Sequence, residues 1–279
     1  MTTPEVPYRI EIAVEVPGTP EQVWHALATT AGISSWFLPT DVDEREGGAI
    51  VAHMGEIDSP GTVTGWDPPR RFAYQEPGWA EISGHPEGVV SPLATEFLVE
   101  ARSGGTCVVR VVSSAFGTGA DWEREVIDEM ERYWMPYFEH QLRLYLERFA
   151  GQRATTMALS VDVPGRPDDV GAAVERALEV TEVGQTVEVV GLTGTVERRG
   201  RPYLVLRVTD PVPGYVSVFA TDSQAGTPDE PMASANVQAW LFGDGDGDRA
   251  RAYVDEATPA WRSWLAGLAA TDATGPATR

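Results

Sequence analysis

A ten-residue phrase occurs twice in the chain, and this repeat constrains the fold more than any other feature. The first copy, VEVPGTPEQV, covers Val14 to Val23, and the second, VDVPGRPDDV, covers Val161 to Val170. Six of the ten positions are identical, and two others exchange Glu for Asp. In each copy a strand pattern ends at Pro-Gly, and Pro followed by an acid then opens a helix. We therefore predict two tandem domains of one ancestry.

The closing segments of the two copies are also alike. PYFEHQL, from Pro136 to Leu142, is similar to PAWRSWL, from Pro259 to Leu265. This pair lies 123 residues apart, whereas the first pair lies 147 apart, so the second domain is predicted to be 24 residues shorter. We expect much of the shortfall to lie opposite residues 33–48. The expected domains are 1–152 and 153–271, followed by a small, polar, disordered tail at 272–279.

Hydrophobic periodicity and turn signals predict the elements of each domain. In domain one, we expect strands at 9–16, 41–45, 49–57, 61–67, 71–75, 95–101 and 107–114, and helices at 20–28, 31–36 and 121–149. Pro136 should kink the last helix. In domain two, we expect strands at 158–163, 187–191, 193–198, 203–209, 216–221 and 233–242, and helices at 167–180 and 250–268. Pro259 is expected to kink or break the last of these helices.

The composition excludes several classes of function. Lys+Arg number 21 and Asp+Glu number 42, for a net charge of −21, and such a surface repels nucleic acid and anionic lipid. The sequence contains no Lys, which excludes a phosphate-loop lysine or a Schiff base. The lone Cys107 forms no internal disulfide, and neither a membrane-length apolar run nor a signal peptide is evident. We expect a cytoplasmic protein that binds neither nucleic acid nor membrane.

Several phrases of domain one closely resemble the SRPBCC (START-like) superfamily, in the branch named for activators of heat-shock-protein (Hsp90) ATPases. IEIAVEVPGTPEQVWHAL is similar to the first strand and helix of the family, and ISSWF to its short second helix. GGAIVAHMGE, GTVTGWDPPRRFAYQ and TEFLVEARSGGTCVVRVVSSAF resemble its strands, and YWMPYFEHQLRLYLE its closing helix. The resemblance covers about residues 8–150. Domain two lacks the WF helix and the DPPRR turn, so we assign it, as a degenerate copy, by the repeat alone.

This resemblance implies an α+β helix-grip fold, in which an antiparallel sheet wraps around a long C-terminal helix, here in two tandem copies. Some members hold a small, largely apolar ligand between sheet and helix, and a few close rings. A fold of this kind does not by itself fix a function. Aromatic residues and polar groups at inward strand positions then become the candidate ligand-binding residues: Trp24, Trp36, Phe37, His53, Trp66, Tyr74, Glu76, Arg110, Tyr133 and Tyr137. Periodicity is equally consistent with an ordinary filled core.

The sequence assigns no catalytic residue, cofactor or metal. His53 with Glu56 would suit an acid–base pair, but strand alternation directs the two side chains to opposite faces. The four histidines have no metal-ligand spacing, and GDGDGD at 243–248 departs from a calcium loop at its sixth and twelfth positions. The Gly- and Pro-rich stretch 78–93 is expected to be a loop that covers a cavity mouth.

Three functions remain open at this point. The first is a protein that holds a small apolar or aromatic molecule in a cavity between the sheet and the C-terminal helix. The second is an aromatase/cyclase-like enzyme that acts on a polyketide. The third is a chaperone-type module that binds a protein partner, and homodimer formation is also left open.

Overall fold

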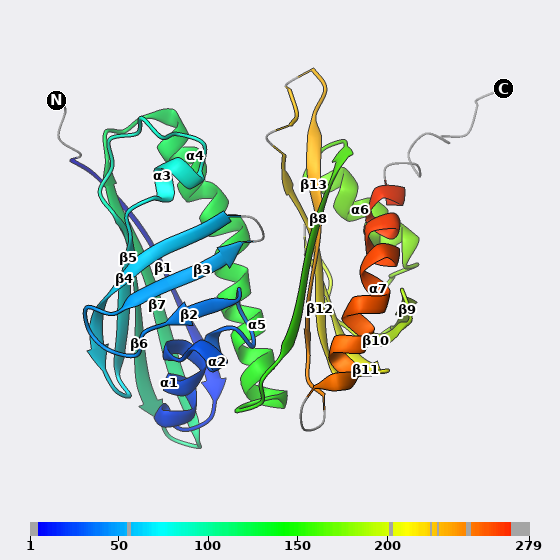
Figure 1. Ribbon diagram of the computed structural model, residues 1–279, viewed down its shortest axis with the longest axis horizontal. Coiled ribbons are helices and arrows are strands. Elements are labelled where there is room, and N and C mark those ends of the chain that lie inside the picture. The colour runs from blue at the N-terminus through cyan, green and yellow to red at the C-terminus, as the bar shows by residue number, and fades with distance from the viewer. Residues whose placement is uncertain are drawn as a thin grey trace. The chain divides into compact units, whose positions relative to one another are not determined.

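The computed structural model describes residues 5–54, 57–200, 203–223, 225–227, 229–243 and 247–268. The chain divides into two compact units, Met1–Arg153 and Ala154–Arg279. Each unit contains one antiparallel sheet and its own helices (Figure 1). No helix in the described ranges is long and apolar enough to cross a membrane.

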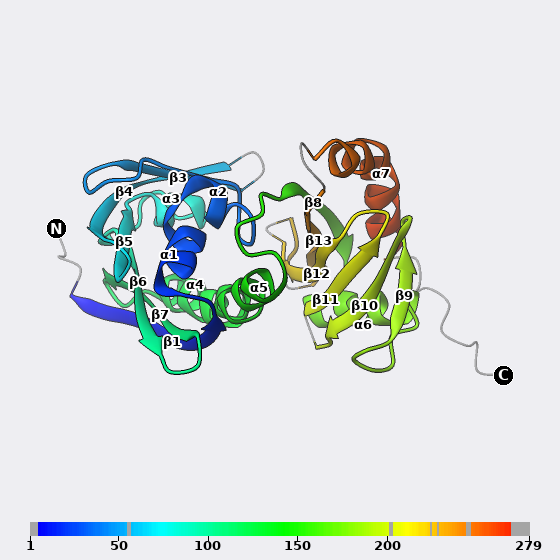
Figure 2. The ribbon, with the colours of Figure 1, turned by 90° about the horizontal axis from the view of Figure 1, so that it is seen from below.

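The first unit is built on a seven-stranded sheet with strand order β1-β7-β6-β5-β4-β3-β2. Its strands are β1 (Val6–Pro17), β2 (Thr40–Val42), β3 (Ala49–Met54), β4 (Ile57–Asp67), β5 (Arg71–Glu76), β6 (Leu93–Arg102) and β7 (Thr106–Gly117). Its helices are α1 (Pro20–Ala28), α2 (Thr30–Ile33), α3 (Trp79–Ile82), α4 (Asp121–Glu129) and α5 (Met135–Arg148). The sheet curves around the helices, which lie on its inner side (Figure 2).

The closing helix of the first unit is interrupted by a π-helical turn, η1 (Met130–Trp134), between α4 and α5. The predicted kink at Pro136 therefore takes the form of a widened turn just before the proline. Because Pro136 has no backbone N–H to donate, a regular α-helical turn is disfavoured there. The π turn absorbs this conflict and lets α5 continue along the inner face of the sheet.

The second unit repeats this plan in shorter form. Its six-stranded sheet has the order β8-β13-β12-β11-β10-β9. Its elements are β8 (Thr155–Pro164), α6 (Pro167–Ala177), β9 (Thr186–Val189), β10 (Leu192–Arg198), β11 (Tyr203–Asp210), β12 (Gly214–Asp222), β13 (Met232–Leu241) and α7 (Asp248–Gly267). Both helices pack on one face of the sheet (Figure 1).

The units differ in two segments, and the first of them is where the sequence placed the shortfall. α6 leads directly into β9, so the segment that holds α2 and β2 in the first unit has no counterpart. A three-residue connection, 211–213, joins β11 to β12, whereas 16 residues including α3 join β5 to β6. α7 continues through Pro259, so of the kink or break expected at that residue, the break does not occur. The packing of α7 on β8 and β13 outweighs the local cost of the proline.

The Pro-Gly corners of the two units have the same backbone geometry. Gly18 and Gly165 both have φ of +118°, a conformation that L side chains rarely adopt. The N–H of Gly18 donates to the Gly105 carbonyl at 3.0 Å, and that of Gly165 donates to the Pro231 carbonyl at 2.9 Å. Each corner thus ties the first strand of its unit to the hairpin of the last two strands. The repeated phrase encodes this corner and the helix that follows it.

The positive φ of Gly165 predicts how a substitution at this corner changes the stability of the second unit. In Gly165→Ala the new Cβ meets no close atom, so its cost is the strain of φ +118° alone. We expect a loss of about 1–3 kcal/mol in the free energy of unfolding, measured by urea denaturation. Gly267→Ala is the matched control, because it lies in α7 with open space at Cβ and should leave stability equal or higher. Equal midpoints for the two variants would contradict the strained corner.

Candidate functional site

The inner face of the first sheet, defined as the face toward α1 and α5, is lined by stacked aromatic rings. Phe72 on β5 and Phe97 on β6 stack with ring centroids 6.0 Å apart. Phe97 also contacts Phe138 of α5 edge-on at 5.6 Å, and Phe138 stacks on Phe37 at 5.1 Å. These rings join sheet, closing helix and α2 loop in one continuous apolar layer.

The other aromatic residues predicted for the site extend this layer. Trp24 of α1 meets Trp66 of β4 edge-on at 5.1 Å, and Trp66 is half-buried. Trp36 is fully buried and donates its indole N–H to the Ala26 carbonyl at 2.8 Å. Tyr137 meets the Phe37 ring at 6.4 Å. Tyr133 is buried within the π turn.

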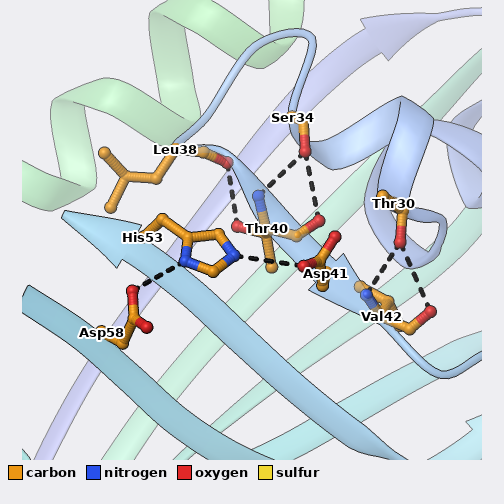
Figure 3. A network of polar contacts seen from close by, with 8 residues as sticks. All are labelled: Thr30, Ser34, Leu38, Thr40, Asp41, Val42, His53 and Asp58. Atoms are coloured by element: carbon orange, nitrogen blue, oxygen red, sulfur yellow. Dashed lines mark hydrogen bonds and ion pairs between the residues drawn. The ribbon is translucent and has the colours of Figure 1, made fainter. Parts of the chain in front are cut away.

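A network of hydroxyl groups fixes the loop that carries Trp36 and Phe37 (Figure 3). Ser34 accepts from the Thr40 N–H at 2.9 Å and donates to the Thr40 carbonyl at 3.1 Å. Thr30 accepts from the Val42 N–H at 2.8 Å. These bonds tie α2 to the edge strand β2, and so hold Trp36 and Phe37 against the inner face.

Five polar side chains cross this aromatic face, and we call them the polar row: Ser59, Tyr74, Glu76, Thr95 and Ser113. Ser59 donates its hydroxyl to Glu76 Oε1 at 2.5 Å. Thr95 hydrogen-bonds to Tyr74, and its Oγ1 lies 3.2 Å from the Ser113 hydroxyl. The strand register places Tyr74 opposite Thr95, and Thr95 opposite Ser113. The row therefore runs across β4, β5, β6 and β7 on one side of the sheet.

The acidic members of the polar row have perturbed pKa values. Burial raises the pKa of Glu76, although the hydrogen bond from Ser59 opposes that shift. Burial also raises the pKa of the Tyr74 phenol, and the nearby Glu76 charge raises it further. Both groups are thus biased toward their neutral, proton-bearing forms, in which each is a hydrogen-bond donor.

The second unit shows what the fold requires at the same positions. The repeat equates Val14 with Val161, and the strand pairings then equate Ser113 with Ala239, Thr95 with Val216 and Tyr74 with Leu206. Continuing along the strand, Glu76 corresponds to Val208. All four counterparts belong to the apolar core of the second unit. An apolar row thus suffices to build this sheet and pack its helices, so the fold does not require the polar row.

His53 lies on the outer face of the sheet, away from the polar row. Its Nδ1 is 2.7 Å from an Asp58 carboxylate oxygen, and its Nε2 is 3.2 Å from one of Asp41 (Figure 3). These hydrogen bonds, with Asp58 first and Asp41 second, raise the pKa of His53. When both ring nitrogens carry protons, His53 donates to both carboxylates. It thus links three adjacent strands, β2, β3 and β4, on the outer face of the sheet.

Arg110 also lies on the outer face. It is exposed on β7, between inward Val109 and Val111, and its Nε is 3.5 Å from a Glu11 carboxylate oxygen. Glu56 and the centre of GDGDGD, residues 244–246, fall outside the described residues. Of the predicted polar candidates in the described ranges, Tyr74 and Glu76 reach the inner face, whereas His53 and Arg110 do not.

The stretch 78–93 is not a plain loop. It contains the short helix α3, whose Trp79 donates its indole N–H to the Ser91 carbonyl at 2.7 Å. Trp79 packs with Leu93 and Ala115 in a small separate cluster, and His85 stacks on Trp122 of α4 at 4.3 Å. The segment is thus fastened both to the sheet and to the closing helix. It lies beside Glu76, because the strand register pairs Glu76 with Leu93.

Sequence reasoning missed Ser59, Thr95, Ser113 and Glu123. The first three occupy strand positions where alternation puts an apolar residue, and that break in pattern was the available signal. Glu123 is fully buried at the start of α4 and accepts four hydrogen bonds, from Tyr8, from the Thr118 N–H and hydroxyl, and from the Gly119 N–H. Burial would raise the pKa of Glu123, but these bonds outweigh it and lower the pKa. Glu123 anchors the helix to β1 and β7.

Within the described residues, no three His, Cys, Asp or Glu side chains come together in a group that would hold a metal ion. The architecture of the first unit, a curved antiparallel sheet around a long closing helix, defines a helix-grip domain. Residues 17–147 match the family model of the "Activator of Hsp90 ATPase homolog 1-like protein". The first unit is therefore a domain of this AHSA1 family, within the SRPBCC proteins, and the second unit is a shortened tandem copy.

Comparison with solved structures returns proteins of low sequence identity. Protein BH1534 of Bacillus halodurans is 20% identical with a TM-score of 0.41, and the match covers 50% of this chain and 96% of that one. The Aha1 dimer of Colwellia psychrerythraea is 18% identical with a TM-score of 0.40, and covers 50% and 97%. The di-domain ARO/CYC BexL of the BE-7585A biosynthetic pathway is 18% identical with a TM-score of 0.40, and covers 96% and 99%. A search of curated proteins found no match.

Replacing the three hydrogen-bonded hydroxyls of Tyr74, Thr95 and Ser113 by apolar groups tests whether the fold needs them. In Tyr74→Phe/Thr95→Val/Ser113→Ala all three partners are removed together, so no buried hydroxyl is left unpaired. We expect the free energy of unfolding to stay within about 1 kcal/mol of the parent. Thr95→Val alone, which leaves Tyr74 and Ser113 without their shared partner, should cost about 1–3 kcal/mol. A triple variant less stable than the single one would show that the row is structural.

The outer-face triad predicts the titration of His53. We expect its pKa, followed by NMR of the imidazole ring, to lie above the ordinary value of about 6.5. Asp58→Asn should lower it most and Asp41→Asn less, while Asp67→Asn, which removes an exposed carboxylate bound to Arg70, should leave it unchanged. Because the folded-state pKa is raised, the stabilisation is complete below about pH 6.5 and is lost as pH rises through the raised value. An unchanged His53 pKa in Asp58→Asn would contradict this geometry.

Proposed function

We propose that the first unit binds a small, largely aromatic molecule between the inner face of its sheet and α5. The carrying observation is the polar row, which lies on a buried aromatic face; four of its five members are replaced by apolar residues in the second unit. Burying polar groups costs free energy relative to apolar packing unless they are hydrogen-bonded. The presence of five polar side chains on this face is therefore expected if they serve a purpose other than packing, such as binding a ligand. Aromatic walls with a few placed polar groups are typical of small-molecule sites.

A catalytic function has less support. An acid–base mechanism needs a donor and an acceptor within reach of one substrate atom. His53, the candidate base, is engaged by Asp41 and Asp58 on the outer face, whereas Glu76 faces the inner side. The polar row itself offers hydroxyls and one carboxyl group, which suit the orientation of a ligand. We therefore propose binding rather than turnover.

Filling the inner face tests this proposal. Ala52 on β3 is paired with Ser59 on β4, so Ala52→Phe adds bulk beside the polar row. Val51→Phe adds the same ring to the opposite face of the same strand and is the matched control. We expect the parent chain to bind naphthalene-type probes 1:1, measured by quenching of tryptophan fluorescence. Ala52→Phe should weaken binding at least about tenfold, a loss of about 1.4 kcal/mol, whereas Val51→Phe should not.

Native mass spectrometry of the purified chain provides a second readout of the same proposal. A co-purifying molecule that is present in the parent and lost in Ala52→Phe would support the site. The proposal fails if the parent carries no bound molecule and binds none of the probes. It also fails if the two Phe variants lose affinity equally, because binding would then not depend on the inner face.

A further inference from the structure

Glu76 is the member of the polar row with unused hydrogen-bonding capacity. Its Oε1 accepts from Ser59, while Oε2 has no hydrogen bond to any of the described residues. The Glu76 side chain is partly exposed. Its Cγ lies beside Gly61, and a Cβ built on that glycine would be 3.3 Å from the Cγ. Tyr74, Thr95 and Ser113, by contrast, are buried and bonded to one another. A ligand on this face would therefore meet the free oxygen of Glu76.

The surroundings of Glu76 are neutral and mostly apolar. The phenol of Tyr74 beside it stays protonated at neutral pH, because burial and the nearby Glu76 charge raise the pKa of that phenol. The residues that face the carboxyl from its own and adjacent strands are Ile50 on β3, Ser59 and Gly61 on β4, Tyr74 on β5 and Leu93 on β6. In such a setting burial favours the protonated acid over the carboxylate.

The charge of this face restricts the ligand. The buried polar side chains of the described part of the inner face are hydroxyls, and Arg71 and Arg110 are occupied by Glu96 and Glu11 on the outer side. An anionic ligand would find no positive partner here, and a buried charge without a partner is costly. A protonated carboxyl, in contrast, offers one O–H donor that is best matched by a neutral acceptor such as a carbonyl oxygen.

We propose that Glu76, in its protonated form, donates a hydrogen bond from its carboxyl group to the carbonyl oxygen of a neutral aromatic ligand held on the inner face. This inference rests on the proposed function and specifies its ligand class. The aromatic layer of Phe72, Phe97 and Phe37 receives the rings of the ligand. Ser59 orients the acid by donating to Oε1, which leaves the other oxygen to carry the proton toward the ligand. No bond is made or broken in the ligand.

The test compares naphthalene with three of its 2-substituted derivatives of similar size: neutral 2-acetylnaphthalene, anionic 2-naphthoate and protonated 2-(aminomethyl)naphthalene. The parent should bind the ketone about tenfold more tightly than naphthalene, and bind the carboxylate least. In Glu76→Leu the preference for the ketone should disappear while naphthalene still binds. Glu76→Gln keeps an N–H donor, so it should keep the preference. Glu100→Gln, on the outer face of β6, is the control and should behave as the parent.

The pH dependence separates a hydrogen-bond donor from a residue that only packs. As pH rises and the Glu76 carboxyl loses its proton, the parent should lose its preference for the ketone. Glu76→Gln should show a flat profile over the same range. This comparison remains available if Glu76→Leu does not fold, since glutamine is nearly isosteric with glutamate.

The possible results distinguish this inference from the function on which it rests. Equal affinity of the parent for the ketone and naphthalene overturns the role of Glu76 but leaves aromatic binding intact. An unchanged preference in Glu76→Leu does the same. Tightest binding of the amine overturns the inference in favour of a carboxylate that pairs with a cation. Failure of all four probes to bind rejects the proposed function itself.

Discussion

The first unit depends on the contact between its closing helix and the aromatic inner face of its sheet. Phe97 is the centre of this contact, because its ring meets Phe72 and Tyr74 on β5 and Phe138 on α5. A curved antiparallel sheet leaves one apolar face to be covered. A single long helix covers that face only if the helix axis follows the curvature of the sheet. The π turn that precedes Pro136 and the anchoring of Glu123 at the start of α4 both maintain that course.

The tandem copy makes it possible to separate what the fold needs from what it only tolerates. Both units keep the Pro-Gly corner, with the same φ at Gly18 and Gly165, the first helix and the closing helix. These features are therefore requirements of the architecture. The side chains of the inner face differ between the units, because the second unit has Leu206 and Val208 at the positions of Tyr74 and Glu76. A single chain thus supplies an internal control of the kind usually obtained by mutagenesis.

The sequence predicted the larger elements because their signals are local. The α1 helix begins at Pro20 and ends at Ala28 as expected, since Thr19 and Gln22 form a capping box and the Thr29 N-cap of α2 follows. α3 was missed because a four-residue helix in a Gly- and Pro-rich stretch has no periodicity to detect.

The site was only partly predictable for a different reason. Strand alternation gives two faces but does not say which of them is the inner one, and His53 on β3 illustrates this. Its aspartate partners are Asp41 on β2, 12 residues away along the chain, and Asp58 on β4, 5 residues away. Ser59 is brought to Glu76 across a 17-residue separation, by a pairing of β4 with β5 that includes a register shift after Val63. Such contacts depend on register, which no local pattern specifies.

The elements that the second unit lacks are those that border the polar row in the first. The α2 loop places Phe37 against Phe138, and the α3 segment packs Trp79 on Leu93, the residue opposite Glu76. Where α2, β2 and α3 are absent, the inner face is uniformly apolar and the connection between β11 and β12 shrinks to three residues. If these insertions served only to enlarge the core, they would bring no polar groups with them. Their association with the half-buried Glu76 carboxyl and its hydroxyl partner instead supports the proposal that the first unit binds a small molecule on this face.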